Sequence, residues 1–212
     1  MLPGTMGLTG WRIKSMKIEF LNNLLNKIKR NNENDFASIF PKHNFQKISD
    51  LKKYPCVISL VEDNTYAYRM FFCADKKFSQ GIIDLINEEF ESNITFENTS
   101  DTLLFLKNEA IVLNVYNDFE GEVVRIITNS EIFVRKLWEL KITPPPPWIS
   151  FPEIDPDGLG SMQGNLSFWW DWMWLPFWNS MDTSEKKYYL IAHSAPLNWI
   201  EYFDFYDTYI NK

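Results

Sequence analysis

Acidic side chains gather in the loop that follows a run of four prolines. Asp155 and Asp157 stand two residues apart in this loop, and Asp171 and His193 follow later in the chain. Two carboxyl groups can act as general acid and general base in glycoside hydrolysis, and a histidine can take either role in other hydrolyses. One interpretation is therefore a hydrolase-type site built from Asp155, Asp157 or Asp171 with His193. The other is a turn whose Asp side chains accept hydrogen bonds from nearby backbone amides.

The sequence contains no recognised catalytic or metal-binding motif. Neither His43 nor His193 belongs to an HExxH motif, and neither has cysteine or carboxylate neighbours at metal-ligand spacing. The patterns GxSxG, GxxxxGK[ST] and GxGxxG do not occur. Cys56 and Cys73 lie in apolar stretches, where a thiol serves as a small buried hydrophobe. We therefore expect no metal, no cofactor and two free thiols.

The elements that would position these residues predict an α+β fold. Apolar residues at spacings of three and four indicate amphipathic helices at 17–30, 78–91 and 132–140. Strand-like stretches occupy 56–61, 65–73, 102–107, 110–116 and 122–128. Their connections are short, which favours antiparallel neighbours. We predict a mostly antiparallel sheet covered by helices, with a Thr128–Glu131 capping box at the start of the helix at 132–140.

The composition changes at residue 143. Eight of the 11 prolines fall between Pro144 and Pro196, and eight of the nine tryptophans fall between Trp138 and Trp199. The four consecutive prolines at 144–147 predict an extended polyproline II segment. The Gly- and Pro-containing stretch 149–164 predicts a loop.

Three helices are expected beyond that loop. The first covers 166–175 and ends near Pro176, where the ring would interrupt it. The second covers 183–192, after a capping box formed by Asp182 and Glu185. The third starts at Pro196 and runs to about residue 206. The chain then divides into a leader (1–15), an α+β body (16–140) and an aromatic- and proline-rich extension (141–212) that packs on the body.

The aromatic run 168–178 allows several interpretations. Trp169, Trp172 or Met173, and Phe177 follow helical spacing, which predicts that they pack in a core. Tryptophan and tyrosine are also common anchors in protein–protein interfaces. Coplanar exposed rings would instead indicate a carbohydrate-binding module, because aromatic faces stack on sugars. We expect a core, with a protein-binding surface as the second interpretation.

The charge distribution limits the partners. The net charge of −7 divides into +6 for residues 1–55, −8 for 56–140 and −5 for 141–212. An acidic body argues against binding to nucleic acid, which requires a basic face, and suits a basic partner. No apolar stretch reaches the length of about 20 residues needed to span a membrane. No secretory signal is visible, so we expect a cytoplasmic protein.

The extension resembles a group of small bacterial proteins. The resemblance covers PPPPWISFP at 144–152, LGSMQG at 159–164 and WWDWMWLPFW at 169–178, and continues to Trp199. Its members are uncharacterised proteins encoded beside bacterial antagonism toxins, including immunity proteins of polymorphic toxin systems. The resemblance implies a non-enzymatic protein that neutralises a toxin by binding it.

On this hypothesis the contact surface is acidic and aromatic. Many nuclease toxins are basic, and an acidic inhibitor can steer its own association with such a target. The acids that we expect to carry this surface are Glu88, Glu89, Glu91, Glu120 and Glu122. The expected partner is thus a protein, in the sharper form a basic toxin domain, and the sequence leaves the oligomeric state open. The alternative remains a hydrolase-type enzyme with the carboxylate and histidine site described above.

Overall fold

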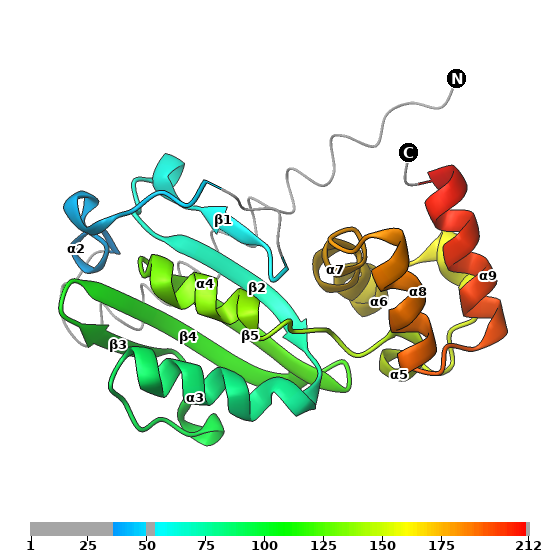
Figure 1. Cartoon of the computed structure of the whole chain (residues 1–212), viewed down its shortest axis with the longest axis horizontal. Coiled ribbons are helices and arrows are strands. Elements are labelled where there is room, and N and C mark those ends of the chain that lie inside the picture. The colour runs from blue at the N-terminus through cyan, green and yellow to red at the C-terminus, as the bar shows by residue number, and fades with distance from the viewer. Residues whose placement is uncertain (1–35, 50–53, 211–212) are drawn as a thin grey trace.

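The computed structural model describes residues 36–49 and 54–210 of the chain. The predicted leader 1–15 and the predicted helix 17–30 lie outside these residues. Figure 1 shows a sheet body, which extends to residue 140, and an aromatic extension, residues 141–210, joined by a linker. The fold is α+β as predicted, and the extension lies at one end of the sheet.

The sheet contains five strands in the order β1-β2-β5-β4-β3, and all neighbouring strands are antiparallel. The strands are β1 (Val57–Ser59), β2 (Tyr68–Ala74), β3 (Thr102–Leu106), β4 (Glu109–Asp118) and β5 (Gly121–Thr128). Phe119 and Glu120 connect β4 to β5 with φ angles of 54° and 58°. Two left-handed residues in succession are typical of a type I′ hairpin, which forces antiparallel pairing.

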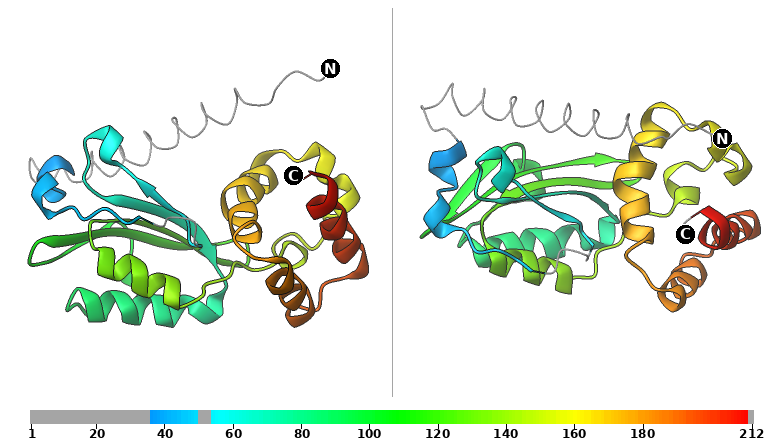
Figure 2. Two further views of the ribbon diagram at one scale, coloured as in Figure 1. Left: turned by 45° about the horizontal axis from the view of Figure 1, so that its top comes forward. Right: turned by 90° about the horizontal axis from the view of Figure 1, so that it is seen from above.

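Two helices cover one face of the sheet, as Figure 2 shows. They are α3 (Ser79–Glu89) and α4 (Glu131–Glu139). Both bury their apolar stripe, with Ile82 and Ile86 from α3 and Phe133 and Leu137 from α4 fully or almost fully enclosed. Aliphatic side chains of β2, β4 and β5 complete this core. Removal of this apolar surface from water is the main term that stabilises the layer.

The start of α4 differs from the prediction. Thr128 is still part of β5, and its hydroxyl donates a hydrogen bond to the carbonyl of Ala110 at 2.7 Å. Ser130 is the N-cap instead, and its hydroxyl oxygen accepts from the backbone N–H of Phe133 at 3.2 Å. The predicted Thr128–Glu131 capping box is therefore wrong, because the Thr128 hydroxyl oxygen accepts from the backbone N–H of Ser130 at 3.1 Å, before the helix begins, while its proton is donated across the sheet.

A smaller apolar cluster occupies part of the opposite face. The short helix α2 (Phe36–Ile39) begins this segment, and Ile39 and Phe40 pack against Val112 and Ile127 of the sheet. Leu60, Ala67 and Ala110 complete the cluster. The edge hairpin formed by β1 and β2 turns at Asn64, which has a φ of 57°. The predicted turn at Asp63 and Asn64 therefore agrees with the structure.

The aromatic extension consists of short helices. They are α5 (Pro147–Ser150), α6 (Gly164–Trp169), α7 (Leu175–Trp178), α8 (Thr183–Ala192) and α9 (Leu197–Phe205). A 3-10 segment spans Pro156–Ser161. The loop predicted at 149–164 therefore contains this helical turn, and the end of α5 overlaps its start. The predicted capping box at Asp182 and Glu185 is present at the start of α8. Among the residues that the structure describes, no helix is both long and apolar enough to cross a bilayer.

The helical path that begins with α6 continues into α7 and through Pro176, where the sequence predicts an end. Residues Trp170–Trp174 form a π-helical segment, and the backbone N–H of Leu175 bonds to the carbonyl of Trp170. A proline ring normally clashes with the carbonyl four residues earlier. The wider π turn lies at this position, so the chain passes Pro176 and remains helical to Trp178.

The core of the extension is built from aromatic rings. Trp174 lies at its centre, stacked on Trp178 with ring centroids 5.7 Å apart and on Trp169 at 5.6 Å. Trp178 in turn stacks on Phe203 of α9 at 4.1 Å. The predicted core residues Trp169, Met173 and Phe177 are buried. The carbohydrate-binding interpretation loses its basis for this run, because most of its tryptophans are enclosed.

Ring contacts also join the extension to the sheet body. Phe177 packs edge-on against Tyr54 at 5.2 Å, and Phe168 lies 5.8 Å from Phe71 of β2. Aliphatic residues of the sheet and the tryptophans of the extension belong to one continuous buried cluster. The linker crosses the sheet at Gly121, where an added Cβ would lie 2.8 Å from the Pro145 ring and 2.5 Å from the Ala74 carbonyl oxygen. Only a residue without a side chain fits at this crossing.

Candidate functional site

Of the acids predicted for a hydrolase-type site, Asp155 acts as a local cap and Asp157 supplies the backbone N–H that it caps. Asp155 precedes the 3-10 segment, and its carboxylate accepts from the backbone N–H of Asp157 at 3.0 Å. The side-chain amide of Asn198 approaches the same carboxylate at 3.5 Å. Asp171 lies on the π-helical segment and accepts from the Ser167 hydroxyl at 3.4 Å. Asp155 therefore behaves as the second interpretation of the sequence expects, as a turn residue whose side chain accepts a hydrogen bond from a nearby backbone amide.

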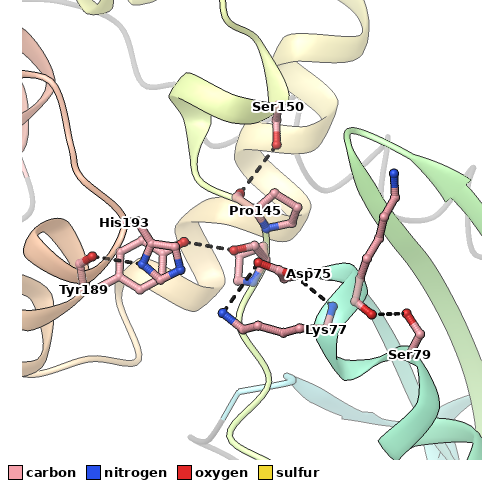
Figure 3. A network of polar contacts seen from close by, with 9 residues as sticks. Asp75, Lys77, Ser79, Pro145, Ser150, Tyr189 and His193 are labelled. Atoms are coloured by element: carbon pink, nitrogen blue, oxygen red, sulfur yellow. Dashed lines mark hydrogen bonds and ion pairs between the residues drawn. The ribbon is translucent and has the colours of Figure 1, made fainter.

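His193 ends α8 and is held by its own helix. Its ring stacks on the ring of Tyr189 with centroids 3.9 Å apart, and its Nδ1 lies 3.0 Å from the Tyr189 carbonyl oxygen, as Figure 3 shows. Its backbone carbonyl accepts from the indole N–H of Trp148 at 3.1 Å. In the described part of the chain, no hydrogen bond or ion pair joins His193 to any of the three predicted carboxylates.

The residues around His193 fix the linker to the sheet. The Tyr189 hydroxyl donates to the carbonyl of Pro144 at 2.9 Å, and the backbone N–H of Asp75 donates to the carbonyl of Thr143 at 2.8 Å. Ser150 donates to the carbonyl of Phe119 at 3.0 Å. Burial, with the nearby charge of Asp75, raises the pKa of Tyr189 well above its ordinary value. These contacts hold the linker in place, and Figure 3 shows the proline linker between the two regions.

The five predicted partner-binding glutamates lie in three different environments. Glu88 and Glu89 both form ion pairs with Lys136 of α4, at 2.9 Å and 2.5 Å, and these hydrogen bonds raise the pKa of Lys136. Glu91 and Glu120 are exposed in left-handed turns after α3 and between β4 and β5. Glu122 is only 6% exposed. The acids therefore differ in their capacity to meet a partner.

Glu122 faces the helical layer of the sheet body. On β5 it has the same parity as Val124 and Ile126, which point into the core beneath α3 and α4. It lines a cavity of about 280 Å³ with Ser79 and Ile83 of α3. Burial raises the pKa of this carboxyl, while a hydrogen bond from Ser79 and the charge of Lys76 oppose that change. The signal that could have identified Glu122 as core-facing is its place on a strand, in register with the apolar Val124 and Ile126, whereas Glu91 and Glu120 lie in turns.

Exposed apolar side chains concentrate in the last helices. Of nine large hydrophobic side chains that are exposed among the described residues, five lie beyond residue 187: Tyr188, Ile191, Leu197, Phe205 and Tyr209. Phe205 and Tyr209 lie one helical turn apart, with ring centroids 5.0 Å apart. Sequence analysis does not identify these residues, because aromatic residues occupy several sides of α9 and its buried and exposed faces have the same composition.

One side of α9 combines apolar and acidic side chains. Leu197, Glu201 and Phe205 are four residues apart, and Asp204 follows Glu201 by three. Tyr209 follows Phe205 by four, in the π-helical segment Tyr206–Ile210 that continues α9, and all five residues are exposed. We call these five residues the α9 stripe. The opposite side of the helix is buried through Trp199 and Phe203. The α9 stripe is therefore a surface-facing band on a helix whose other side is anchored in the aromatic core.

No protein-family model, no curated protein and no solved structure matches this chain. Within the described residues, no group of three or more histidine, cysteine, aspartate or glutamate side chains could hold a metal ion. Cys73 is buried, and Cys56 is partly buried; neither forms a disulfide. Burial raises the pKa of both thiols, that of Cys73 to about 12.

Proposed function

We propose that this protein acts by binding a protein partner through the α9 stripe, and that the partner is a basic domain such as a bacterial toxin. The observation that carries the proposal is the exposure of Leu197, Phe205 and Tyr209 along one side of a helix. Large exposed apolar side chains on neighbouring turns are typical of interaction sites, where aromatic residues supply most of the binding energy. The immunity-type role implied by the resemblance of the extension is the sharper form of this proposal.

Charge defines the chemistry of the partner. Glu201 and Asp204 lie within the α9 stripe, and residues 141–212 carry a net charge of −5. An acidic rim around apolar anchors attracts a basic surface and speeds its association at low salt. The exposed Glu91 and Glu120 add to the same long-range field. Because Glu88 and Glu89 are paired with Lys136, they contribute less to it.

The test compares two phenylalanines of equal exposure. Phe205 of the α9 stripe is 54% exposed and Phe105 of β3 is 56% exposed. A partner captured from the native host and then purified is titrated with the wild-type chain, the Phe205→Glu variant and the Phe105→Glu variant. We expect Phe205→Glu to weaken binding by at least about 30-fold, the effect of losing a strong interface anchor, and Phe105→Glu to change it less than about twofold.

The contrary results are equally specific. Unchanged binding by Phe205→Glu, or an equal loss by Phe105→Glu, would remove the α9 stripe as the binding site. Co-expression decides between an inhibitor and an adaptor. If the partner arrests growth, an inhibitor restores it in the wild-type form and fails to do so as Phe205→Glu. Failure of the wild-type chain to restore growth would contradict the immunity-type role, and equal restoration by Phe205→Glu would contradict binding through the α9 stripe.

A further inference from the structure

The cavity beside Glu122 is a built pocket in the sheet body. It measures about 280 Å³ and opens between the first turn of α3, residues 94–96 and the start of β5. Ile83, Ile94 and Phe96 supply apolar walls, and Ser79 and Thr95 supply hydroxyl groups. Thr95 is exposed and Glu122 is buried, so Thr95 lies toward the rim and the carboxylate lies deeper. We call this cavity the Glu122 pocket.

The carboxylate in this pocket has few hydrogen-bond donors. Ser79 carries one hydroxyl proton, which it donates to the carbonyl of Lys76 at 2.6 Å. Glu122 competes with that carbonyl for the same proton, since one hydroxyl donates one hydrogen bond at a time. Lys76 is exposed, and the structure describes no ion pair between its ammonium group and Glu122. The carboxylate thus faces the open pocket with two acceptor oxygens and one side-chain donor from the protein, which it shares with that carbonyl.

A protonated primary amine supplies what the carboxylate lacks. An ammonium group carries three donors and a positive charge, and a short alkyl chain matches the apolar walls formed by Ile83, Ile94 and Phe96. The volume lies at the lower limit of ligand pockets, which excludes a large ligand. An anion is excluded by the charge of Glu122. A quaternary amine is disfavoured because it has no N–H to donate.

We propose that the Glu122 pocket binds a protonated primary amine on a short alkyl chain. The amine has two sources, a lysine side chain of a protein partner or a free small amine, and both present the same group. The proposal does not depend on the α9 stripe, because the pocket belongs to the sheet body. Failure of one proposal therefore leaves the other standing.

The test uses the full chain and observes the isoleucine methyl groups by NMR. Ile83 and Ile94 line the pocket, so their methyl resonances report on occupancy. The probes are butylammonium chloride, 1-butanol and butyltrimethylammonium chloride, each at constant ionic strength. We expect saturable shifts of both methyl groups with butylammonium alone. Glu122→Gln should weaken the binding at least tenfold. Glu91→Gln removes an exposed carboxylate just after the same helix, and should change the binding less than twofold.

Two further measurements keep the test decisive. If Glu122→Gln does not fold, Thr95→Trp replaces it, because a large side chain at the rim should block entry while leaving Glu122 in place. Titration with the methylamide of Nα-acetyl-lysine identifies the source: binding as tight as that of butylammonium favours a lysine side chain, and its absence favours a free amine. Absence of saturable shifts with butylammonium, equal shifts with 1-butanol, or wild-type binding by Glu122→Gln would overturn the proposal.

Discussion

The sheet body and the aromatic extension reach stability by different means. The sheet is held by ladders of backbone hydrogen bonds between five strands, over a core made largely of Ile, Val and Leu. The extension is helical and has no strand ladder among its described residues, and its core is a set of tryptophan and phenylalanine rings. The same region that buries the largest side chains also exposes most of the large apolar ones.

This difference has a functional consequence. A helix that depends on ring packing on one side can present an exposed band of side chains on its other side, as α9 does. The sheet body instead offers a concave polar site at Glu122. The continuous core between the two regions predicts that they nevertheless unfold as one unit.

The largest effect is expected from Trp174→Ala. The Trp174 ring contacts those of Trp169, Trp170, Trp178 and Phe203, so its loss leaves a large cavity. We expect the free energy of unfolding to fall by about 3–5 kcal/mol, as for other buried tryptophans. Urea denaturation with amide exchange measures it. Faster exchange confined to the extension, with sheet amides unchanged, would show that the two regions unfold independently.

The crossing of the linker over the sheet is tested by a pair of glycines. Gly121→Ala forces a Cβ against the Ala74 carbonyl, the Pro145 ring and the Cys73 sulfur, and should destabilise the fold by about 1–3 kcal/mol. Gly81→Ala lies within α3 with no atom within 4 Å of the new Cβ. It should stabilise the fold by about 0.5–1 kcal/mol, because alanine is the better helix former. Similar shifts in both variants, read from thermal unfolding, would refute the close crossing.

One helix cap in each region can be removed, and the loss of stability can then be compared between the sheet body and the extension. Ser130→Ala removes the cap of α4, and Asp182→Ala removes the cap of α8. Each should lower the free energy of unfolding by about 1 kcal/mol. Asp182→Asn keeps an accepting side chain and should be close to neutral. If Asp182→Asn costs as much as Asp182→Ala, the carboxylate acts by its charge and the hydrogen-bonded cap is the wrong explanation.

The smallest expected effect is the pH dependence contributed by Glu122. Burial raises the pKa of this carboxyl, so the folded state holds its proton where the unfolded state releases it. That contribution is complete below the ordinary carboxyl pKa of 4.5 and is lost as pH rises through the folded value. Ser79 and the charge of Lys76 reduce the effect. Urea midpoints from pH 4 to pH 8 should therefore shift in favour of Glu122→Gln as pH increases, and a difference that does not vary with pH would contradict the assignment.

Much of the fold follows from local patterns in the sequence. The strands, helices α3 and α4, and the Asp182 cap all arise from periodicity and capping chemistry that act within a few residues. The departures have tertiary causes. Thr128 is the last residue of the predicted strand, and the sequence does not show that Ser130 rather than Thr128 caps the next helix, because the hydroxyl of Thr128 bonds to the carbonyl of Ala110 across the sheet. The passage through Pro176 depends on a π turn that has no signature in residue spacing.

The functional residues were harder to identify than the fold. Glu122 resembles Glu120 in sequence, but Glu120 lies in the turn between β4 and β5, whereas Glu122 lies on β5 with its side chain toward the core. Phe203 and Phe205 are two residues apart in an aromatic run, and one is buried while the other is exposed. Nothing in residue type distinguishes them. The direction in which α9 faces the core is set by contacts with Trp170 and Trp178, which are distant in sequence.

Hydrogen exchange of the full chain, with and without the captured partner, tests the central claim most directly. Binding through the α9 stripe predicts that amides in residues 197–209 exchange more slowly in the complex, while those of the β3–β4 hairpin keep their rates. Protection confined to the sheet body, with residues 197–209 unchanged, would contradict the account.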